Sequence, residues 1–562
     1  MNITPRLLSV SKSPEVFLKD YLKSCGVKDI PTFLNPDDSV LDNPTDYKDF
    51  ESGLKLFRQV MINRQNIGII VDSDLDGICS ASLINNFIRS HRKLRPTLFL
   101  HEGKQHGLKD VFEQVKETQL DLLIIPDAGS DNIELLEELC EMGMSILILD
   151  HHKIADEVFD ELYQSAYRNQ IALINPNHFD AYRPLDTHIC GTAVTWQFVR
   201  GYCEQYKVNL PYYLDLVGVA TIADVMDLSS LSNRYFVETA LTNPIENEML
   251  NLVFEKKLRK GLNSVGIGWD IGPLFNAVCR ADDMEIKELV VKAMSGLKYE
   301  ANALKGMVSM YNRQTNNTKR IQEYLVKNMI TDHVVDVAFG EVEDAPYLGL
   351  CANKLLSASG KPTFVLRELN ETTWSGSLRS PVPISQAINE SGCGKAMGHD
   401  EAAGLIINKN ELDNLLSYLD SHLDLGFEPN TVVTAIVKPK ELTVKLVNMI
   451  KEYERIWGNG VPSPTFYISG KCLPSNISIF RKRTNTLKFV VDGVEFVKFF
   501  AKERELEQVI KAIDSGVEVA VNMVVTPELN EWNGVTKAQG LIEKFEINWN
   551  MDIDEKSFEE LF

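Results

Sequence analysis

The sequence predicts an α/β protein of several domains that contains a parallel sheet, and three apolar runs predict that sheet. The runs are continuous, and stretches of helical length with polar patterning separate them: 67–71, 122–126 and 146–149. Such runs are typical of strands that are buried on both faces of a parallel sheet. Each run is followed directly by an acidic residue: Asp72, Asp127 and Asp150.

These acidic residues predict a metal site, because ligands gather at the carboxyl ends of parallel strands. Asp74 and Asp76 follow the first run, and His151-His152 follow the third. In an extended chain Asp72, Asp74 and Asp76 would point to the same side. So many carboxylates in one crevice require cations. Oxygen ligands suit Mg²⁺ and Mn²⁺, and added imidazole favours Mn²⁺. Taken alone, the aspartate cluster is equally compatible with a calcium loop, a solvated acidic loop or a cluster that caps a helix.

Further along the chain, several segments indicate the remaining domains. Residues 284–330 show helical spacing of leucines and methionines without proline, so we expect long helices. We expect strands at 334–339 and 363–366, with a turn leading into a helix over 345–355. Residues 487–499 contain an Asp-Gly pair and predict a hairpin, after which 517–521 alternates like a strand.

Four motifs of the chain resemble those of the DHH phosphoesterase superfamily, in the same order: Asp72-Ser73-Asp74-Leu75-Asp76-Gly77, Asp127-Ala128-Gly129, Asp150-His151-His152 and Ala223-Asp224-Val225. Other segments are similar to those of RecJ-like single-strand-specific exonucleases: Asn175-Pro176-Asn177, 190–194, Leu214-Asp215-Leu216-Val217, 276–280, 375–380, Gly398-His399 with Ala402-Ala403-Gly404, and 530–534. The resemblance runs from about Phe33 to about Ile547.

The resemblance implies a multi-domain α/β fold: a parallel-sheet DHH domain, a smaller α/β DHH-associated domain joined to it by long helices, and a five-stranded C-terminal β-barrel of the oligonucleotide-binding (OB) type. The expected boundaries are a lead-in at 1–45, the DHH metal-binding domain at 46–240, a helical connector at 241–330, the DHH-associated substrate-binding domain at 331–428, the OB-type barrel at 429–550 and an acidic tail at 551–562.

The resemblance also assigns ligands to two divalent cations, with Mn²⁺ favoured and Mg²⁺ possible. Asp74 and Asp127 would hold one cation, and the other would be held by Asp76, Asp127, His151 and Asp224. A water between the metals would be the nucleophile. Asp72 would either ligate directly or lie behind the ligands, and Asp150 would orient the adjacent histidine. His152 would contact the scissile phosphate.

Substrate-binding residues are expected elsewhere in the chain. Ser377 and Arg379 would hold the terminal phosphate or the first nucleotide, with His399 and Arg280 as further candidates. For any single arginine the alternative is a surface ion pair. His101 stands where cellular RecJ enzymes carry an arginine, so this chain is expected to read a terminal 5′ phosphate less strictly unless Lys104 or His106 compensates. In the barrel, the nucleic-acid-binding candidates are Trp532, Arg481, Lys482 and Arg483.

Composition limits the function classes. The 562 residues include 58 Lys and Arg against 79 Asp and Glu, a net charge of −21. This balance counts against a DNA coat or architectural protein, because such proteins neutralise phosphates with lysine and arginine. The nine cysteines lack paired metal-type spacing and indicate reduced thiols. The chain has neither an apolar run long enough to cross a membrane nor the apolar core of a signal peptide at its start.

The leading hypothesis is a metal-dependent exonuclease that degrades single-stranded DNA from the 5′ end and releases mononucleotides during repair, recombination or replication. One alternative is a DHH-family phosphodiesterase for short oligonucleotides or cyclic dinucleotides, and a second is a non-catalytic replication scaffold. We expect a monomer that acts in the cytoplasm, that of the host if the source is a virus. A helicase or a single-strand-binding protein would be its partner.

Overall fold

The structure is a computed structural model that describes residues 1–10, 13–103, 105–130, 132–178, 185–423, 430–481 and 484–549. The chain divides into two compact units. The parallel-sheet unit contains Pro31–Asn316 and Arg455–Val461, and the two-sheet unit contains Met1–Ile30, Asn317–Glu454 and Pro462–Phe562. The domain boundaries expected from the sequence stay a prediction.

The parallel-sheet unit is built on five parallel strands in the order β3-β2-β4-β5-β6. Their bounds are β2 Ile67–Val71, β3 Thr97–Leu100, β4 Leu122–Pro126, β5 Ser145–Leu149 and β6 Ile171–Ile174. Every residue of β2 and β4 is buried. The three strands expected from the apolar runs are therefore confirmed, and they lie side by side as β2, β4 and β5.

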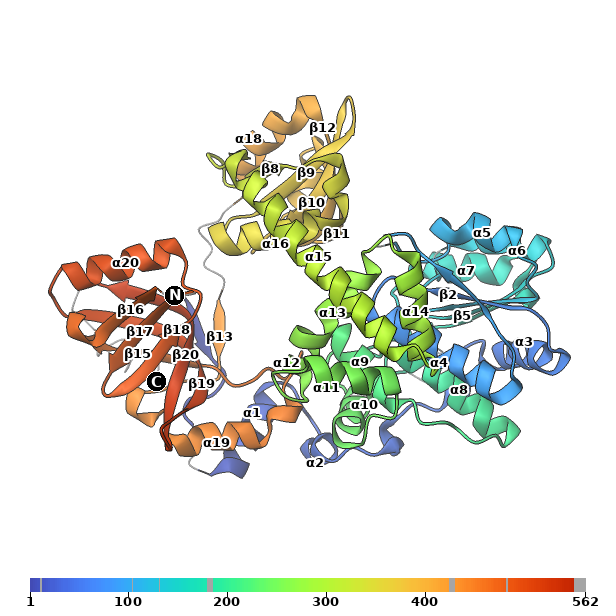
Figure 1. Ribbon diagram of the computed structural model, residues 1–562, viewed down its shortest axis with the longest axis horizontal. Helices are drawn as coiled ribbons and strands as arrows, with labels where there is room; N and C mark the ends of the chain where they lie inside the picture. The colour runs from blue at the N-terminus through green and yellow to red at the C-terminus, as the bar shows by residue number, and fades with distance from the viewer. Residues whose placement is uncertain are drawn as a thin grey trace. The chain divides into compact units, whose positions relative to one another are not determined.

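Helices cover both faces of this sheet (Figure 1). On one face lie α3 Phe50–Asn63, α4 Leu75–Arg92 and α8 Gly191–Tyr206, and on the other lie α5 Phe112–Glu117, α6 Ile133–Glu141 and α7 Asp156–Gln164. Successive strand residues supply the two cores alternately: Ile69 packs into the first and Ile70 into the second. Strand side chains alternate between faces, so a strand covered on both sides is apolar at every position.

The rest of this unit is helical. The helices are α2 Ile30–Leu34, α9 Leu214–Ala223, α10 Leu231–Thr242, α11 Glu248–Lys257, α12 Ser264–Gly266, a π-helical turn Ile267–Ile271, α13 Gly272–Cys279, α14 Met284–Met294 and α15 Glu300–Lys327, which runs on into the two-sheet unit. The long helices expected over 284–330 are confirmed by α14 and α15. The end of α9 matters for the site, because Asp224 follows it directly.

The first sheet of the two-sheet unit has the order β11-β12-β10-β9-β8-β7. Its strands are β7 Met329–Ile330, β8 Asp336–Phe339, β9 Thr363–Asn370, β10 Thr373–Arg379, β11 Gly394–His399 and β12 Ala402–Asn408, and the helices beside it are α16 Leu348–Ser359, α17 Ser385–Glu390 and α18 Leu412–His422. The strands expected at 334–339 and 363–366 are confirmed, as is the helix expected within 345–355.

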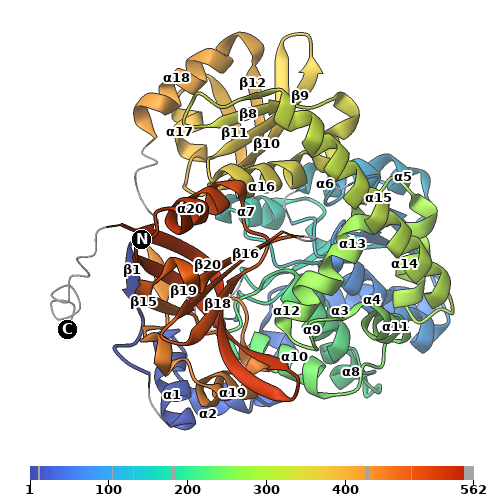
Figure 2. The same cartoon turned by 60° about the vertical axis from the view of Figure 1, so that its left-hand side comes forward.

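The second sheet has seven strands in the order β14-β15-β19-β20-β18-β17-β16. Figure 2 labels β15, β16, β18, β19 and β20 among them. The strands are β14 Ala435–Ile436, β15 Phe466–Cys472, β16 Ile477–Arg481, β17 Asn485–Val491, β18 Val494–Lys498, β19 Val519–Trp532 and β20 Val535–Asn548. The remaining elements are α1 Pro14–Ser24, α19 Val444–Glu452, α20 Glu503–Asp514 and a pair of short parallel strands, β1 Ile3–Pro5 and β13 Thr431–Val433.

The hairpin expected at 487–499 is confirmed by β17 and β18. Its turn residues Asp492 and Gly493 have φ of 52° and 81°, as a two-residue type I′ turn requires. The expected five-stranded barrel differs from the structure in strand number and closure: among the described strands, seven form the sheet and no pairing joins the outer strands β14 and β16. Sequence patterning shows where strands are, whereas non-local pairings such as the parallel one between β18 and β20 decide closure.

Candidate metal centre

The carboxyl ends of β2, β4 and β5 bring the acidic residues together, as expected from the sequence. Asp72, Asp127 and Asp150 directly follow these strands, and each is at most 2% exposed. Asp127 has a left-handed backbone with φ of 63°, and its N–H donates to the Leu149 carbonyl at 2.8 Å. A buried non-glycine residue in this conformation is strained, and such strain clusters at functional sites.

The segment after β2 differs from the extended chain expected for Asp72, Asp74 and Asp76, and that prediction is wrong. α4 already begins at Leu75, so Asp74 is its N-cap and Asp76 lies in its first turn. The Asp74 carboxylate accepts from the Gly77 N–H at 3.0 Å. Aspartate is favoured at a helix N-cap because it satisfies an unpaired N–H and interacts with the positive end of the helix dipole. This local interaction outweighs the alternating pattern.

The N-terminus of α8 binds the carboxylate of Asp76. Asp76 accepts from the N–H groups of Gly191 and Thr192 at 2.7 and 2.8 Å, and from the Thr192 hydroxyl at 2.5 Å. A Cβ added at Gly191 would lie only 2.3 Å from Asp127 Oδ1. Glycine at this position therefore lets the helix end approach both aspartates at once.

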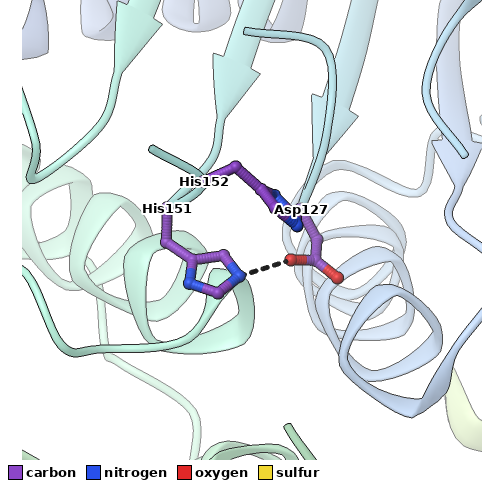
Figure 3. Close-up of side chains that lie close together, drawn as sticks. All are labelled: Asp127, His151 and His152. Carbon is purple, nitrogen blue, oxygen red and sulfur yellow. Dashed lines mark ion pairs between the residues drawn. The ribbon is translucent and has the colours of Figure 1, made fainter. Parts of the chain in front are cut away.

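His151 lies at the centre of the acidic cluster. Its Nε2 is 3.2 Å from Asp127 Oδ1, 3.6 Å from Asp224 Oδ2 and 3.8 Å from Asp76 Oδ2. Figure 3 shows the ring of His151 directed at the Asp127 carboxylate. Burial lowers the pKa of His151, which favours the neutral imidazole that binds metals. The structure thus brings together the four residues that the resemblance assigned to one cation.

Three carboxylates of the cluster have a raised pKa in the absence of a cation. Burial raises the pKa of Asp127 well above its usual value and, helped by the charge of Asp76, raises the pKa of Asp224 to about 8. Burial raises the pKa of Asp74 as well. Asp127 Oδ1 and Asp224 Oδ2 are buried, and neither accepts a hydrogen bond from the described residues. Buried oxygens of this kind fit a divalent cation, which would replace the protons.

Asp150 orients His152. Its Oδ1 accepts from His152 Nδ1 at 2.8 Å and from the His151 N–H at 2.8 Å, and its Oδ2 accepts from the Ser130 N–H at 3.3 Å. The hydrogen bond to Asp150 raises the pKa of His152 to about 9. Burial raises the pKa of Asp150, but the hydrogen bond and charge of His152 outweigh it and the pKa falls to about 2. The pair is therefore an ionised carboxylate with an imidazolium.

The Asn175-Pro176-Asn177 segment fixes the backbone of both histidines. The Asn177 side chain donates to the His151 carbonyl at 2.7 Å, and the Asn175 side chain donates to the His152 carbonyl at 3.0 Å. Both asparagines follow β6, the strand next to β5. This segment was one of the motifs in the sequence, and its physical role in the structure is to hold the backbone of the two histidines.

The phosphate candidates fall in both units. In the two-sheet unit, Ala402 lies on β12 between two neighbouring strands. Arg379 on β10 lies opposite it on one side, and His399 on β11 lies opposite it on the other. Ser377 lies two residues from Arg379 on the same strand, so the three side chains share one face of the sheet. A Cβ added at Gly349 on α16 would be 3.1 Å from Arg379 Nη2 and 3.6 Å from Ser377 Oγ, which places both side chains against that helix.

Arg280 and His101 belong to the parallel-sheet unit. Burial lowers the pKa of Arg280. His101 is 1% exposed, and neither of its ring nitrogens has a hydrogen-bond partner among the described residues. The structure therefore places the ring of His101 in the interior, and its backbone carbonyl accepts from Lys287 Nζ at 2.6 Å.

The nucleic-acid candidates of the C-terminal sheet are partly described. Trp532 ends β19 and is 74% exposed, beside the Asn533-Gly534 turn. Arg481 ends β16 and is exposed. Lys482 and Arg483 lie outside the described residues, as does the acidic tail at 551–562.

Two residues near the cluster carried no metal or positioning role in the sequence analysis. His106 Nδ1 lies 2.7 Å from Asp72 Oδ2, and the buried Lys287 on α14 donates to the His101 and Gly103 carbonyls. His106 follows β3, the strand beside β2. Ligands gather at the carboxyl ends of parallel strands, so the position of His106 after β3 could have indicated it as it indicated the aspartates. Nothing local in the sequence around Lys287 indicates its role.

Two family models match the chain. The DHH family, N-terminal domain, matches residues 66–221, and the RecJ OB domain matches residues 433–544. The chain therefore contains a DHH-family domain and a RecJ-type OB domain, a combination that makes it similar to RecJ-like proteins. The OB match agrees with the expected class of the C-terminal domain, although its sheet is not closed among the described strands.

Relatives of this RecJ-like chain cover nearly all of it. The putative SPbeta prophage-derived single-strand DNA-specific exonuclease YorK of Bacillus subtilis is 26% identical over 575 residues, which is 94% of this chain and 96% of the relative. The crystal structure of RecJ in complex with Mn²⁺ from Thermus thermophilus has a TM-score of 0.72 at 18% identity and covers 94% of this chain and 75% of that one. The Mg²⁺ complex from the same organism has a TM-score of 0.68 at 17% identity, with coverages of 97% and 77%.

Among the described residues of this RecJ-like chain, no helix is both long enough and apolar enough to span a membrane.

Proposed function

We propose that this chain is a metal-dependent exonuclease that hydrolyses phosphodiester bonds in single-stranded DNA. The observation that carries the proposal is the buried acidic cluster around His151, because such a cluster suits divalent cations and phosphoryl-transfer chemistry. The substrate class comes from the relatives, since YorK is named as a single-strand DNA-specific exonuclease. The RecJ OB domain supports a binding surface for a strand longer than a dinucleotide.

Two cations, with Mn²⁺ favoured over Mg²⁺, are part of the proposal. Asp74 and Asp127 would hold one, and the second would be held by Asp76, His151 and Asp224 with Asp127 shared. Cations bound there would activate a water for attack and neutralise charge on the phosphoryl oxygens. Asp72 lies beside Asp74, where it either ligates or supports the ligands.

His152 would contact the scissile phosphate. Its side chain is 60% exposed, and Asp150 occupies its Nδ1, so Nε2 is the nitrogen that can donate to a phosphoryl oxygen. With a pKa of about 9 the ring is protonated at neutral pH and can stabilise developing negative charge. Asp150 acts through His152, because its own oxygens are buried and occupied by hydrogen bonds.

A cleft of about 540 Å³ beside His152 supports the binding of a nucleotide. Lys109 and Lys153 line it and offer positive charge to phosphates. Arg280, Ser377, Arg379 and His399 are proposed to bind the backbone or the terminal phosphate. His101 can take part only through its backbone or after a change of conformation, because its ring is buried. Trp532 and Arg481 would bind the strand farther from the cleaved bond.

The finer points of the proposal are 5′ to 3′ polarity, release of mononucleotides, action as a cytoplasmic monomer, and cooperation with a helicase or a single-strand-binding protein in repair, recombination or replication. They rest on the resemblance to RecJ enzymes. The domain boundaries given above are part of the same proposal.

A long single-stranded DNA labelled at its 5′ or its 3′ end tests the function in the presence of Mn²⁺. We expect the 5′ label to leave first as a mononucleotide and Asp127→Asn to be inactive. The matched control is Asp160→Asn, an exposed aspartate on α7 that should retain full activity. Early loss of the 3′ label would contradict the polarity and leave the chemistry intact.

The same assay separates the two alternatives. Faster turnover of a dinucleotide than of the long strand would favour a phosphodiesterase for short oligonucleotides. No cleavage of either substrate, together with no Mn²⁺ binding at millimolar concentration, would favour a non-catalytic scaffold.

A further inference from the structure

The loop after β3 carries an imidazole into the acidic cluster. His106 Nδ1 is 2.7 Å from Asp72 Oδ2. Asp72, Asp74 and His106 each offer a donor atom, and these atoms all lie within 4.8 Å of one another. Asp76, His151 and Asp224 form a second set that is equally compact. These two groups each contain two carboxylates and one imidazole, and a third group joins Asp127 to His151 and His152.

The backbone around His106 is anchored on both sides. The Gly107 N–H donates to Asp72 Oδ1 at 3.1 Å. Lys287 Nζ donates to the carbonyls of His101 and Gly103 at 2.6 and 3.0 Å, and this lysine is only 6% exposed. Gly103 and Gly107 have φ of 67° and 73°, a conformation that other residues rarely adopt. These hydrogen bonds therefore fix the loop that carries the imidazole.

A third observation points to a cation at the centre of the cluster. Asp127, which the proposed function shares between the two cations, is 2% exposed, and its Oδ1 accepts no hydrogen bond from the described residues. A buried carboxylate oxygen without a donor is costly unless a cation binds it. This oxygen lies 3.2 Å from His151 Nε2, so a cation is required at the centre of the cluster, between the two proposed metal positions.

We propose that His106 is a ligand of the cation beside Asp74, so that each of the two cations has one imidazole ligand. The inference rests on the two-cation site of the proposed function and adds a residue to it. Imidazole is a better ligand for Mn²⁺ than for Mg²⁺, which prefers oxygen and retains its waters. His106 therefore gives the Asp74 side of the site its preference for Mn²⁺.

Mn²⁺ binding to the full chain, followed by electron paramagnetic resonance, tests this role. Spin-echo modulation detects the nitrogen nuclei of imidazole ligands, and it should report two histidines on wild type and one on His106→Ala. We expect His106→Ala to keep one Mn²⁺ site and to bind the second Mn²⁺ about tenfold more weakly or worse. Mg²⁺ affinity should change by much less, so the ratio of Mn²⁺ to Mg²⁺ affinity falls.

His188→Ala is the matched control, because His188 is an exposed histidine of the same unit and is absent from both donor groups. It should leave nitrogen modulation and affinity unchanged. His106→Asn keeps an N–H donor for Asp72 without an imidazole nitrogen. If His106 merely orients Asp72 by a hydrogen bond, this variant restores Mn²⁺ affinity, and that result would overturn the proposal.

The outcomes also separate this inference from the proposed function. The inference alone is wrong if wild type degrades single-stranded DNA but His106→Ala keeps both Mn²⁺ sites and an unchanged nitrogen signal. The proposed exonuclease activity is wrong, and the role of His106 as a ligand is retained, if wild type binds two Mn²⁺ ions through two histidines but cleaves no DNA. His106 is half exposed, so its replacement should not unfold the chain, which a melting curve checks.

Discussion

The side chain of Asn459 donates a 2.6 Å hydrogen bond to the backbone carbonyl of Val225, the residue that follows Asp224. Val225 has φ of 55° and closes the end of α9. Its N–H donates to the Ile222 carbonyl at 3.2 Å, and the Met226 N–H donates to the Thr221 carbonyl at 3.1 Å. These bonds form a Schellman cap, in which glycine normally occupies the left-handed position.

A β-branched residue in this conformation costs about 1–3 kcal/mol and persists only where its surroundings hold it. The Asn459 side chain holds the Val225 carbonyl, and the Asn459 carbonyl accepts from the Leu228 N–H at 2.9 Å, three residues further along the chain. It belongs to the short segment Arg455–Val461, which packs with the parallel-sheet unit although it follows the six-stranded sheet in sequence. This segment therefore supports the turn that carries a predicted metal ligand.

Asn459→Ala should weaken the site without unfolding the chain. Loss of the hydrogen bond to Val225 should reduce the free energy of unfolding by about 1 kcal/mol. It should also free Asp224 to move, which lowers kcat more than it changes KM for single-stranded DNA. Denaturation curves and steady-state kinetics measure the two effects.

Val225→Gly is the companion variant. Val225 is 63% exposed, so glycine removes little packing and relieves the left-handed strain. We expect a gain of about 1 kcal/mol in the free energy of unfolding. A loss of stability in this variant would mean that the conformation of Val225 carries no strain.

Gly191→Ala should abolish cation binding while the fold survives. The added Cβ would lie 2.3 Å from Asp127 Oδ1, so either the helix end or the carboxylate must move. Calorimetric titration with Mn²⁺ measures the loss. Gly268→Ala is the control, because its added Cβ meets nothing within 4 Å and it should bind Mn²⁺ like wild type.

Asp150→Asn should lower the pKa of His152 from about 9 towards the ordinary histidine value of about 6.5. The raised pKa of His152 stabilises the fold fully below about pH 6.5, and this contribution disappears as the pH rises through 9. The lowered pKa of Asp150 contributes above about pH 4 and is lost as the pH falls through 2.

The stability difference between wild type and Asp150→Asn, both free of metal, should therefore be largest between about pH 4 and 6.5 and should shrink towards pH 9. Denaturation at several pH values measures that difference, and nuclear magnetic resonance measures the histidine pKa directly. An equal difference at pH 6 and above pH 9 would contradict the ion pair.

Cation binding should release protons at neutral pH. Burial raises the pKa of Asp127 well above its usual value and that of Asp224 to about 8, so Asp224 is largely protonated at pH 7 in the metal-free chain and a cation displaces its proton. The apparent affinity for Mn²⁺ should rise with pH up to about 8. Titrations at pH 7 in two buffers with different heats of ionisation count the released protons, and Asp224→Asn should release fewer.

The sequence located the strands and the residues at their ends because both depend on local patterning. A strand covered by helices on both faces must be apolar throughout, so 67–71, 122–126 and 146–149 were recognisable without any partner. The Asp492-Gly493 turn was equally local, since its backbone angles require those residue types.

The sequence failed where one local interaction competes with another. The alternation of Asp72, Asp74 and Asp76 indicated extended chain, whereas the N-cap preference of Asp74 starts α4 one residue later. Both signals are present in the same six residues, and only packing of α4 against the sheet selects the helix. The same aspartates still reach the cluster, but two of them arrive on a helix end.

By itself, the sequence determined which aspartates and histidines follow buried strands, and hence that a metal centre belongs at one edge of the sheet. Only the tertiary structure decided what surrounds them. Val225 and Asn459 are 234 residues apart, Lys287 reaches a loop 184 residues away, and His106 meets Asp72 from the loop after the neighbouring strand. Such contacts depend on how distant segments pack, and no period or local preference in the chain encodes them.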